Sequence, residues 1–208
     1  VCHTGLAETL RALGRSSEAL QAYDAAQQLF SNNPVLLNAK ACLLISLERY
    51  SQARELLKAD KLDTDSASRD YHVLAMSYFY EGDFTIAETM LRTGVKESVI
   101  ASKTIFETAL AVLLIKQHKA NEVLQQWHNG IANVTATPKQ TVIYAHALAE
   151  CQQLADAKAL LDQLEQSPPA VLQISAMLQK LYWTAINSAE QTSLNDQILR
   201  HELDMCLM

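Results

Sequence analysis

The sequence is poor in the residues that break regular structure. Only 5 glycines and 4 prolines occur among 208 residues, which disfavours both disorder and an all-β fold with its many tight turns. Hydrophobic residues make up 49% of the chain and charged residues only 19%, so the chain can bury a core. Alanine, leucine and glutamine dominate, and these residues favour helices. An all-α fold is therefore predicted.

Long apolar runs and an excess of positive charge are also missing. The longest uncharged apolar run, ALAVLLI at 109–115, is far shorter than the roughly 20 residues of a membrane-spanning helix. With 17 basic and 23 acidic residues, the formal charge is −6, so the charge signature of a nucleic-acid binder is absent. No membrane span and no nucleic-acid partner are expected.

The cysteine pattern and the first residues bear on the compartment. The four cysteines lie far apart without a C-x-x-C pair, which favours free thiols in a reducing compartment over a zinc or redox site. A cytoplasmic location is therefore expected. The sequence opens at Val1 within a helical pattern and without a basic leader, so either a leader has been removed or the chain is a segment of a longer protein.

Catalytic signatures are missing as well. The six histidines show no H-E-x-x-H spacing, and no G-x-S-x-G or G-x-x-x-x-G-K-[ST] string occurs. Metal binding and nucleophilic catalysis need such groups to converge. We therefore expect a protein that is not an enzyme, with no cofactor, no metal and no catalytic residue.

What the sequence does contain is a recurring pattern. Small residues at the start of one helical segment recur 34 residues apart at Ala19, Ala53 and Ala87, then after a two-residue slip at Val123, and 34 residues later at Ala157. A helical segment precedes each of them, and it also carries a repeated alanine. These alanines are Ala7, Ala41, Ala75, Ala111 and Ala145. Such periodicity predicts stacked helix-turn-helix units in which small residues allow close packing.

Turn-forming residues stand between the predicted helices. Gly14 and Gly82 lie where the first helix of a unit should end, because glycine tolerates the left-handed conformation of a helix C-terminus. Ser16 or Ser17 is expected to cap the following helix. Pro34 and Pro138 fall between units, where a residue without an N–H can end one helix or open the next.

The third unit combines Tyr71, Leu74-Ala75, Tyr78, Ala87 and Leu91, and it resembles the tetratricopeptide repeat, a helix pair of 34 residues. The resemblance implies a right-handed α-α superhelix of about five repeats, at approximately 1–33, 34–67, 68–101, 104–137 and 138–169. One departure is Lys40, where the family prefers an apolar residue. Residues 170–208 fit the repeat poorly and are expected to form an atypical helix pair that caps the array.

The resemblance further implies a non-catalytic scaffold or adaptor that binds a peptide or helix of another protein in a concave groove lined by the first helices. Carried over unit by unit, the candidate contact residues are Arg11, Asn38, Arg69, His72, Met76, Phe79, Tyr80, Thr108, Val112, Ile115 and His146. Of these, only Arg11, Asn38 and Arg69 could grip a terminal carboxylate, so a full carboxylate clamp is not present. The apolar middle of the set suits an amphipathic helix or a hydrophobic peptide.

Several alternatives stay open at this point. The aromatic stretch MSYFY at 76–80 could belong mostly to the core, and Phe79 and Tyr80 could contact either a partner or the neighbouring unit. The chain could also self-assemble into a homo-oligomer through its uncapped first repeat. A third alternative is a regulatory repeat region of a larger complex or enzyme.

Overall fold

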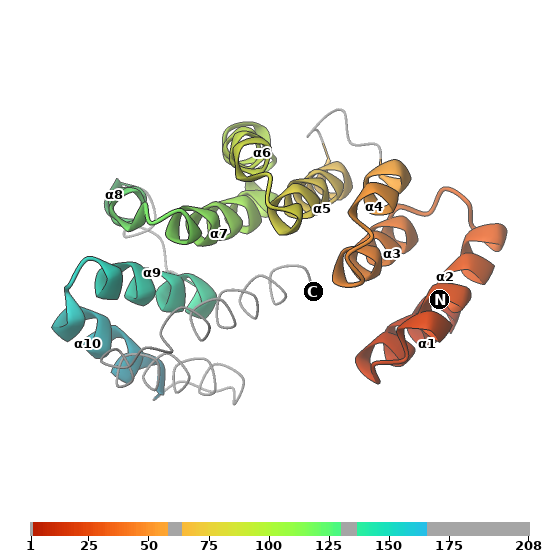
Figure 1. Ribbon diagram of the computed structural model, residues 1–208, viewed down its shortest axis with the longest axis horizontal. Helices are drawn as coiled ribbons and strands as arrows, with labels where there is room; N and C mark the ends of the chain where they lie inside the picture. The colour runs from red at the N-terminus through yellow and green to blue at the C-terminus, as the bar shows by residue number, and fades with distance from the viewer. Residues whose placement is uncertain (1, 58–63, 130–136, 166–208) are drawn as a thin grey trace. The chain divides into compact units, whose positions relative to one another are not determined.

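A computed structural model describes residues 2–57, 64–129 and 137–165 of the chain. All regular secondary structure in these ranges is α-helical, and no strand occurs in them, which confirms the predicted all-α class. The described ranges contain ten helices (Figure 1). The predicted cap at 170–208 lies outside the described residues.

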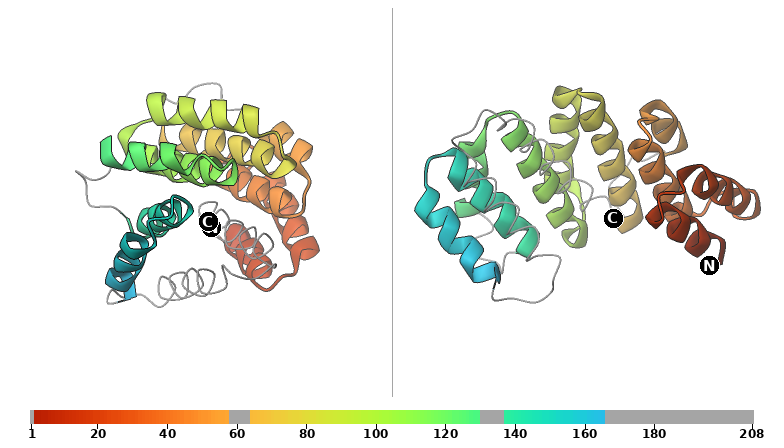
Figure 2. Two further views of the ribbon diagram at one scale, coloured as in Figure 1. Left: turned by 60° about the vertical axis from the view of Figure 1, so that its left-hand side comes forward. Right: turned by 60° about the horizontal axis from the view of Figure 1, so that its bottom comes forward.

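The helices come in consecutive pairs. Their bounds are α1 Cys2–Ala12, α2 Ser16–Leu29, α3 Pro34–Ser46, α4 Tyr50–Leu56, α5 Asp65–Glu81, α6 Phe84–Glu97, α7 Ile100–Lys116, α8 Ala120–Asn129, α9 Pro138–Glu150 and α10 Leu154–Glu165. Turns of two or three residues join α1 to α2, α3 to α4, α5 to α6, α7 to α8 and α9 to α10. Figure 2 shows the members of the pairs α1–α2 and α9–α10 lying side by side, and the two helices of each of these pairs are in contact.

The chain divides into two compact units, Val1–Glu107 and Thr108–Met208. The boundary falls inside α7, so this helix contributes residues to both units. A buried cluster in the first unit gathers residues of α1, α2 and α3: Ala7, Ala19, Tyr23, Ala26, Leu36 and Leu43. A second cluster, in the second unit, gathers residues of α9 and α10: Val142, Tyr144, Ala145, Leu148, Ala149, Ala157, Leu161 and Leu164.

Each turn within a pair contains one residue with a positive φ angle. These five residues follow one another at intervals of 34, 34, 36 and 34 positions. They are Gly14 (φ 73°), Glu48 (φ 60°), Gly82 (φ 95°), His118 (φ 58°) and Gln152 (φ 63°). Gly14 and Gly82 confirm the predicted helix ends, whereas the same conformation at Glu48, His118 and Gln152 was not foreseen.

The hydrogen bonds at these five turns are also the same. In the first turn, the N–H of Gly14 donates to the carbonyl of Arg11 at 2.9 Å, and the N–H of Arg15 donates to the carbonyl of Leu10 at 2.9 Å. The other four turns repeat both bonds with the same spacing, at 2.8–3.1 Å. This pair of bonds is the Schellman motif, which satisfies carbonyls left over at a helix end. Every first helix therefore ends in one way, and the chain reverses direction immediately after it.

Helix starts are capped at several of the described elements. Asn33, Thr64, Asp83 and Thr137 each accept a backbone N–H of the first turn of α3, α5, α6 and α9, respectively. Pro34 and Pro138 each open a helix, which is one of the two roles expected of them. The prediction that Ser16 or Ser17 caps α2 is wrong. Arg15 occupies the cap position without a side-chain cap bond, and its guanidinium instead binds the Glu18 carboxylate at 2.6 and 2.7 Å.

The recurring small residues are almost all buried. Of the alanines and the valine singled out from the sequence, all are at most 5% exposed except Ala111, which is partly exposed. A close approach occurs between α6 and α7, where a Cβ atom on Gly94 would overlap the buried ring of Phe106. Large side chains at such positions would push the helices apart.

The left-handed turns predict opposite effects of two substitutions in the first unit. Glu48→Gly should stabilise the protein by about 0.5–1 kcal/mol, because a side chain in the left-handed region is strained. Gly82→Ala should destabilise it by about 1 kcal/mol, since open space surrounds this glycine and only backbone strain is added. Urea unfolding followed by circular dichroism would measure both shifts, and the expectation fails if the two variants shift stability in the same direction.

Candidate functional site

The candidate contact residue Arg11 on α1 belongs to a small polar network. Its Nε donates to Glu8 Oε2 at 3.0 Å, and the hydroxyl of Tyr23 on α2 donates to the other oxygen of the same carboxylate. Tyr23 is fully buried, and this burial, followed by the bond to Glu8, raises the pKa of its hydroxyl. Arg11 is thus already bound to an acid of its own chain.

The other two candidates for gripping a carboxylate, Asn38 and Arg69, also have acidic partners in the same unit. Asn38 on α3 donates from Nδ2 to Oδ1 of Asp70 on α5 at 2.9 Å. Burial raises the pKa of this carboxyl, while the bond from Asn38 opposes the rise. Arg69 pairs with Asp65 at 2.8 Å one helical turn away. A partner carboxylate at any of the three residues would have to compete with an acid already in place.

Three of the candidates on α5 are buried. Met76 is 0% exposed, His72 3% and Phe79 6%, as the alternative core interpretation expects. The Phe79 ring lies edge-on to Tyr80 at 5.4 Å and tilted against Phe84 at 5.5 Å. Tyr80 is only partly buried. Within the aromatic stretch at 76–80, Tyr80 is therefore the candidate that a partner can reach without disrupting the core.

The candidates of the second unit are buried too. Thr108, Val112 and Ile115 of α7 and His146 of α9 are each at most 6% exposed. His146 places Nε2 3.5 Å from Oε1 of Glu150 one turn further along α9. Contact between these residues and a partner would require local rearrangement, whereas Arg11, Asn38, Arg69 and Tyr80 retain exposed surface.

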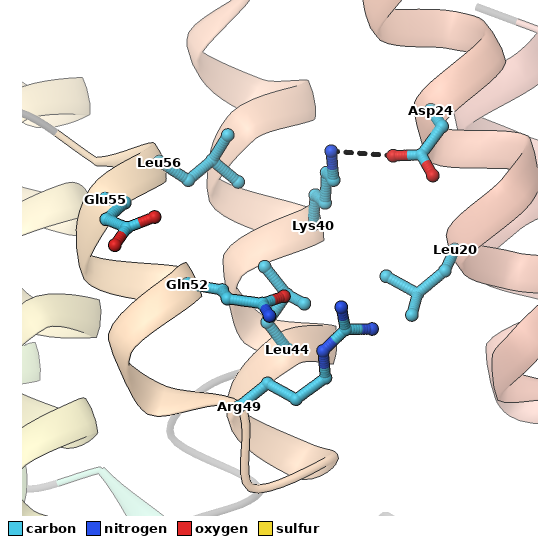
Figure 3. Close-up of a pocket in the computed structure, with 8 residues that line it drawn as sticks. All are labelled: Leu20, Asp24, Lys40, Leu44, Arg49, Gln52, Glu55 and Leu56. Carbon is cyan, nitrogen blue, oxygen red and sulfur yellow. Dashed lines mark ion pairs between the residues drawn. The ribbon is translucent and has the colours of Figure 1, made fainter.

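A cleft that the sequence did not indicate lies among α2, α3 and α4 in the first unit. Figure 3 shows its eight lining residues, which are Leu20, Asp24, Lys40, Leu44, Arg49, Gln52, Glu55 and Leu56. Its volume of about 440 Å³ falls within the range of small-ligand sites. Three leucines, one from each helix, supply the apolar part of the lining.

Lys40 crosses this cleft from α3 to α2. Its ammonium lies 2.7 Å from Oδ1 of Asp24 and donates to Oε1 of Gln27 at 2.6 Å. The Lys40 side chain is only 16% exposed, so much of its aliphatic stem is covered while its charge is paired. The residue that departs from the repeat pattern therefore has a structural partner on the preceding helix.

No metal-binding or membrane-spanning feature occurs in the part of the chain that the structure describes. Among residues 2–57, 64–129 and 137–165, no three His, Cys, Asp or Glu side chains cluster as metal ligands would. In the same ranges, no helix combines the length and apolar character needed to cross a membrane.

The chain matches no protein-family model, and no characterised protein matches it in sequence.

The buried His72 gives the first unit a predicted dependence on pH. Within the described residues its Nε2 has no hydrogen-bond partner, and burial lowers its pKa to about 4 from 6.5. The folded protein therefore disfavours a proton that the unfolded chain accepts below about pH 6.5. This contribution to stability is complete above pH 6.5 and is lost as the pH falls towards 4.

We expect the contribution of His72 to the free energy of unfolding to fall by about 2 kcal/mol between pH 7 and pH 5. The whole protein loses stability over this range through His72 and through its carboxyl groups. His72→Leu should abolish the loss due to His72 and leave the loss due to the carboxyl groups. The measurement is urea unfolding at both pH values. His118→Asn, which leaves His72 in place, serves as the control and should decline as the original protein does. Equal declines in His72→Leu and the control would rule out His72 as the cause.

Proposed function

We propose that this protein is a non-catalytic scaffold or adaptor, built as a tetratricopeptide-like array that winds into a right-handed superhelix. The observation that carries the proposal is the recurrence of one helix-ending turn at 14, 48, 82, 118 and 152. Identical turns at nearly constant spacing are what stacked units of one kind require. Arrays of this kind present extended surfaces to protein partners.

The proposed contact surface is the set of first helices, α1, α3, α5, α7 and α9. On it, Arg69 and Tyr80 are the accessible candidates of α5, the helix that also carries the buried apolar candidates Met76 and Phe79. An aromatic residue and an arginine are the residue types that most often dominate protein interfaces. A peptide or amphipathic helix of a partner protein is the expected ligand, and it would lie across these side chains.

The test is binding by variants that keep the core intact. A photo-crosslinking amino acid at position 80 would first capture the partner, whose affinity for purified variants is then measured. Tyr80→Glu and Arg69→Glu should each weaken binding about tenfold or more. Thr89→Glu, at an exposed position on the second helix α6, is the matched control and should bind normally.

Circular dichroism and the unfolding midpoint would establish that each variant is folded. Substitution of Met76 or Phe79 is unsuitable, because a charge at either buried position would disrupt packing whether or not the residue binds. If folded Tyr80→Glu and Arg69→Glu variants bind as tightly as the control, the contact surface is not the face of α5.

Self-assembly is the second candidate, favoured by two exposed leucines, Leu6 of α1 and Leu13 of the turn that follows it. Leu6 is 52% exposed and Leu13 65% exposed. Because the Leu13 N–H still donates to the carbonyl of Thr9 as in a helix, a separation of seven residues places the two leucines on one side. A second copy could cover this stripe. Light scattering over a concentration series should then show association that Leu6→Lys abolishes and Ile100→Lys does not, since Ile100 is exposed on α7. A monomer at every concentration excludes this mode.

A further inference from the structure

The cleft among α2, α3 and α4 is lined by both leucine and charged side chains, and one charged residue extends into it. Leu20, Leu44 and Leu56 provide aliphatic surface, and Figure 3 shows the Arg49 side chain extending towards the space between Leu20 and Leu44. A site of this composition can receive an aliphatic side chain and one polar group at the same time. Two of its residues, Lys40 and Leu44, lie on the first helix α3, but none of its residues is among the candidate contact residues.

The cations of the first unit differ in what they bind. Seven of them each form an ion pair with an acidic side chain of the same unit. These are Arg11, Arg15, Lys40, Arg54, Arg69, Arg92 and Lys103. Within residues 2–57 and 64–107, no ion pair is found for Arg49 or Lys96. Of these two, only Arg49 lines the cleft. Arg49 is thus the cleft cation with its charge available to a ligand.

The acidic residues of the lining restrict the ligand further. Asp24 already neutralises Lys40 at one wall, and Glu55 stands on α4 at the other. The four charged residues of the lining sum to zero, with Lys40 and Arg49 against Asp24 and Glu55. A polyanion such as a nucleic acid would meet both carboxylates and be repelled, whereas a single carboxylate placed on Arg49 would not.

We propose that this cleft is a second protein-binding site, which takes a short segment of a partner protein bearing an aliphatic side chain next to an acidic one. The aliphatic side chain packs against Leu20, Leu44 and Leu56, and the carboxylate binds the Arg49 guanidinium. Arginine offers donors in a planar fork that matches a carboxylate. A volume of about 440 Å³ admits a few side chains rather than a whole helix, so the segment is short.

The test uses blocked dipeptides as probes in NMR titrations of the full chain. Acetyl-Glu-Leu-amide should shift the amide resonances of α2, α3 and α4 that line the cleft, in a saturable manner. Acetyl-Gln-Leu-amide, which lacks only the charge, should bind about fivefold more weakly. Acetyl-Glu-Ala-amide should also bind more weakly, because its smaller side chain covers less of the leucine surface in the cleft.

The role of Arg49 is isolated by a pair of matched variants. Arg49→Ala should reduce the preference for the Glu probe over the Gln probe to less than about twofold, and Lys96→Ala should keep it at about fivefold. Arg49 is exposed and makes no side-chain cap bond at the start of α4, so its removal should leave the fold intact. Arg49→Glu should reverse the preference in favour of acetyl-Lys-Leu-amide.

Four results would overturn the proposal. They are the absence of saturable shifts at the cleft, equal affinity for the Glu and Gln probes, a preference that survives Arg49→Ala, and competition by inorganic phosphate as strong as that by the peptide. The last would indicate a simple anion site that makes no use of the leucines. None of these results depends on α5. The proposed contact surface at Tyr80 and Arg69 is therefore tested independently of the cleft.

Discussion

The structure depends on one constraint, the reversal of the chain within two or three residues after each first helix. A helix leaves four carbonyls unsatisfied at its end, and the sharp reversal is possible only because two backbone N–H groups fold back onto them. The residue that permits this adopts a positive φ at all five turns. Once the turn is fixed, the second helix must lie against the first, and Ala7 and Ala19 are fully buried in the cluster that α1 and α2 share.

This constraint explains how much of the fold the sequence could predict. Gly14 and Gly82 identify their turns because glycine is the usual residue in this conformation. Glu48, His118 and Gln152 adopt it although nothing in their chemistry indicates it, so only the 34-residue spacing pointed to these turns. The helical segments themselves were foreseen, because helix-forming residues and apolar residues at helical spacing are local features of the sequence. The cap of α2 was not, because Arg15 bonds to Glu18 rather than leaving the cap position to a serine.

The candidate site was less predictable, since its residues depend on partners distant in sequence. Asn38 and Asp70 are separated by 32 residues, yet they form one hydrogen bond, and no local pattern connects them. Met76 and Tyr80 both became candidates because of their positions in a first helix. Those positions do not determine which of the two side chains is buried. Burial is set by the neighbouring helices, and it leaves Tyr80 partly accessible while covering Met76 completely.

The charged side chains of the first unit differ in whether they are already paired with an opposite charge. In the first unit most arginines and lysines are committed to a carboxylate of the same chain, often within one helical turn, as in the pair of Arg69 and Asp65. Exposed pairs of this kind add little stability, but they reduce nonspecific attraction to other anions. A cation without a partner binds a carboxylate at a lower free-energy cost than a paired cation, because no existing ion pair has to be broken. The proposed binding of a carboxylate beside an aliphatic side chain is therefore favoured where pairing is incomplete and aliphatic surface is adjacent, and in the described first unit Arg49 meets both conditions.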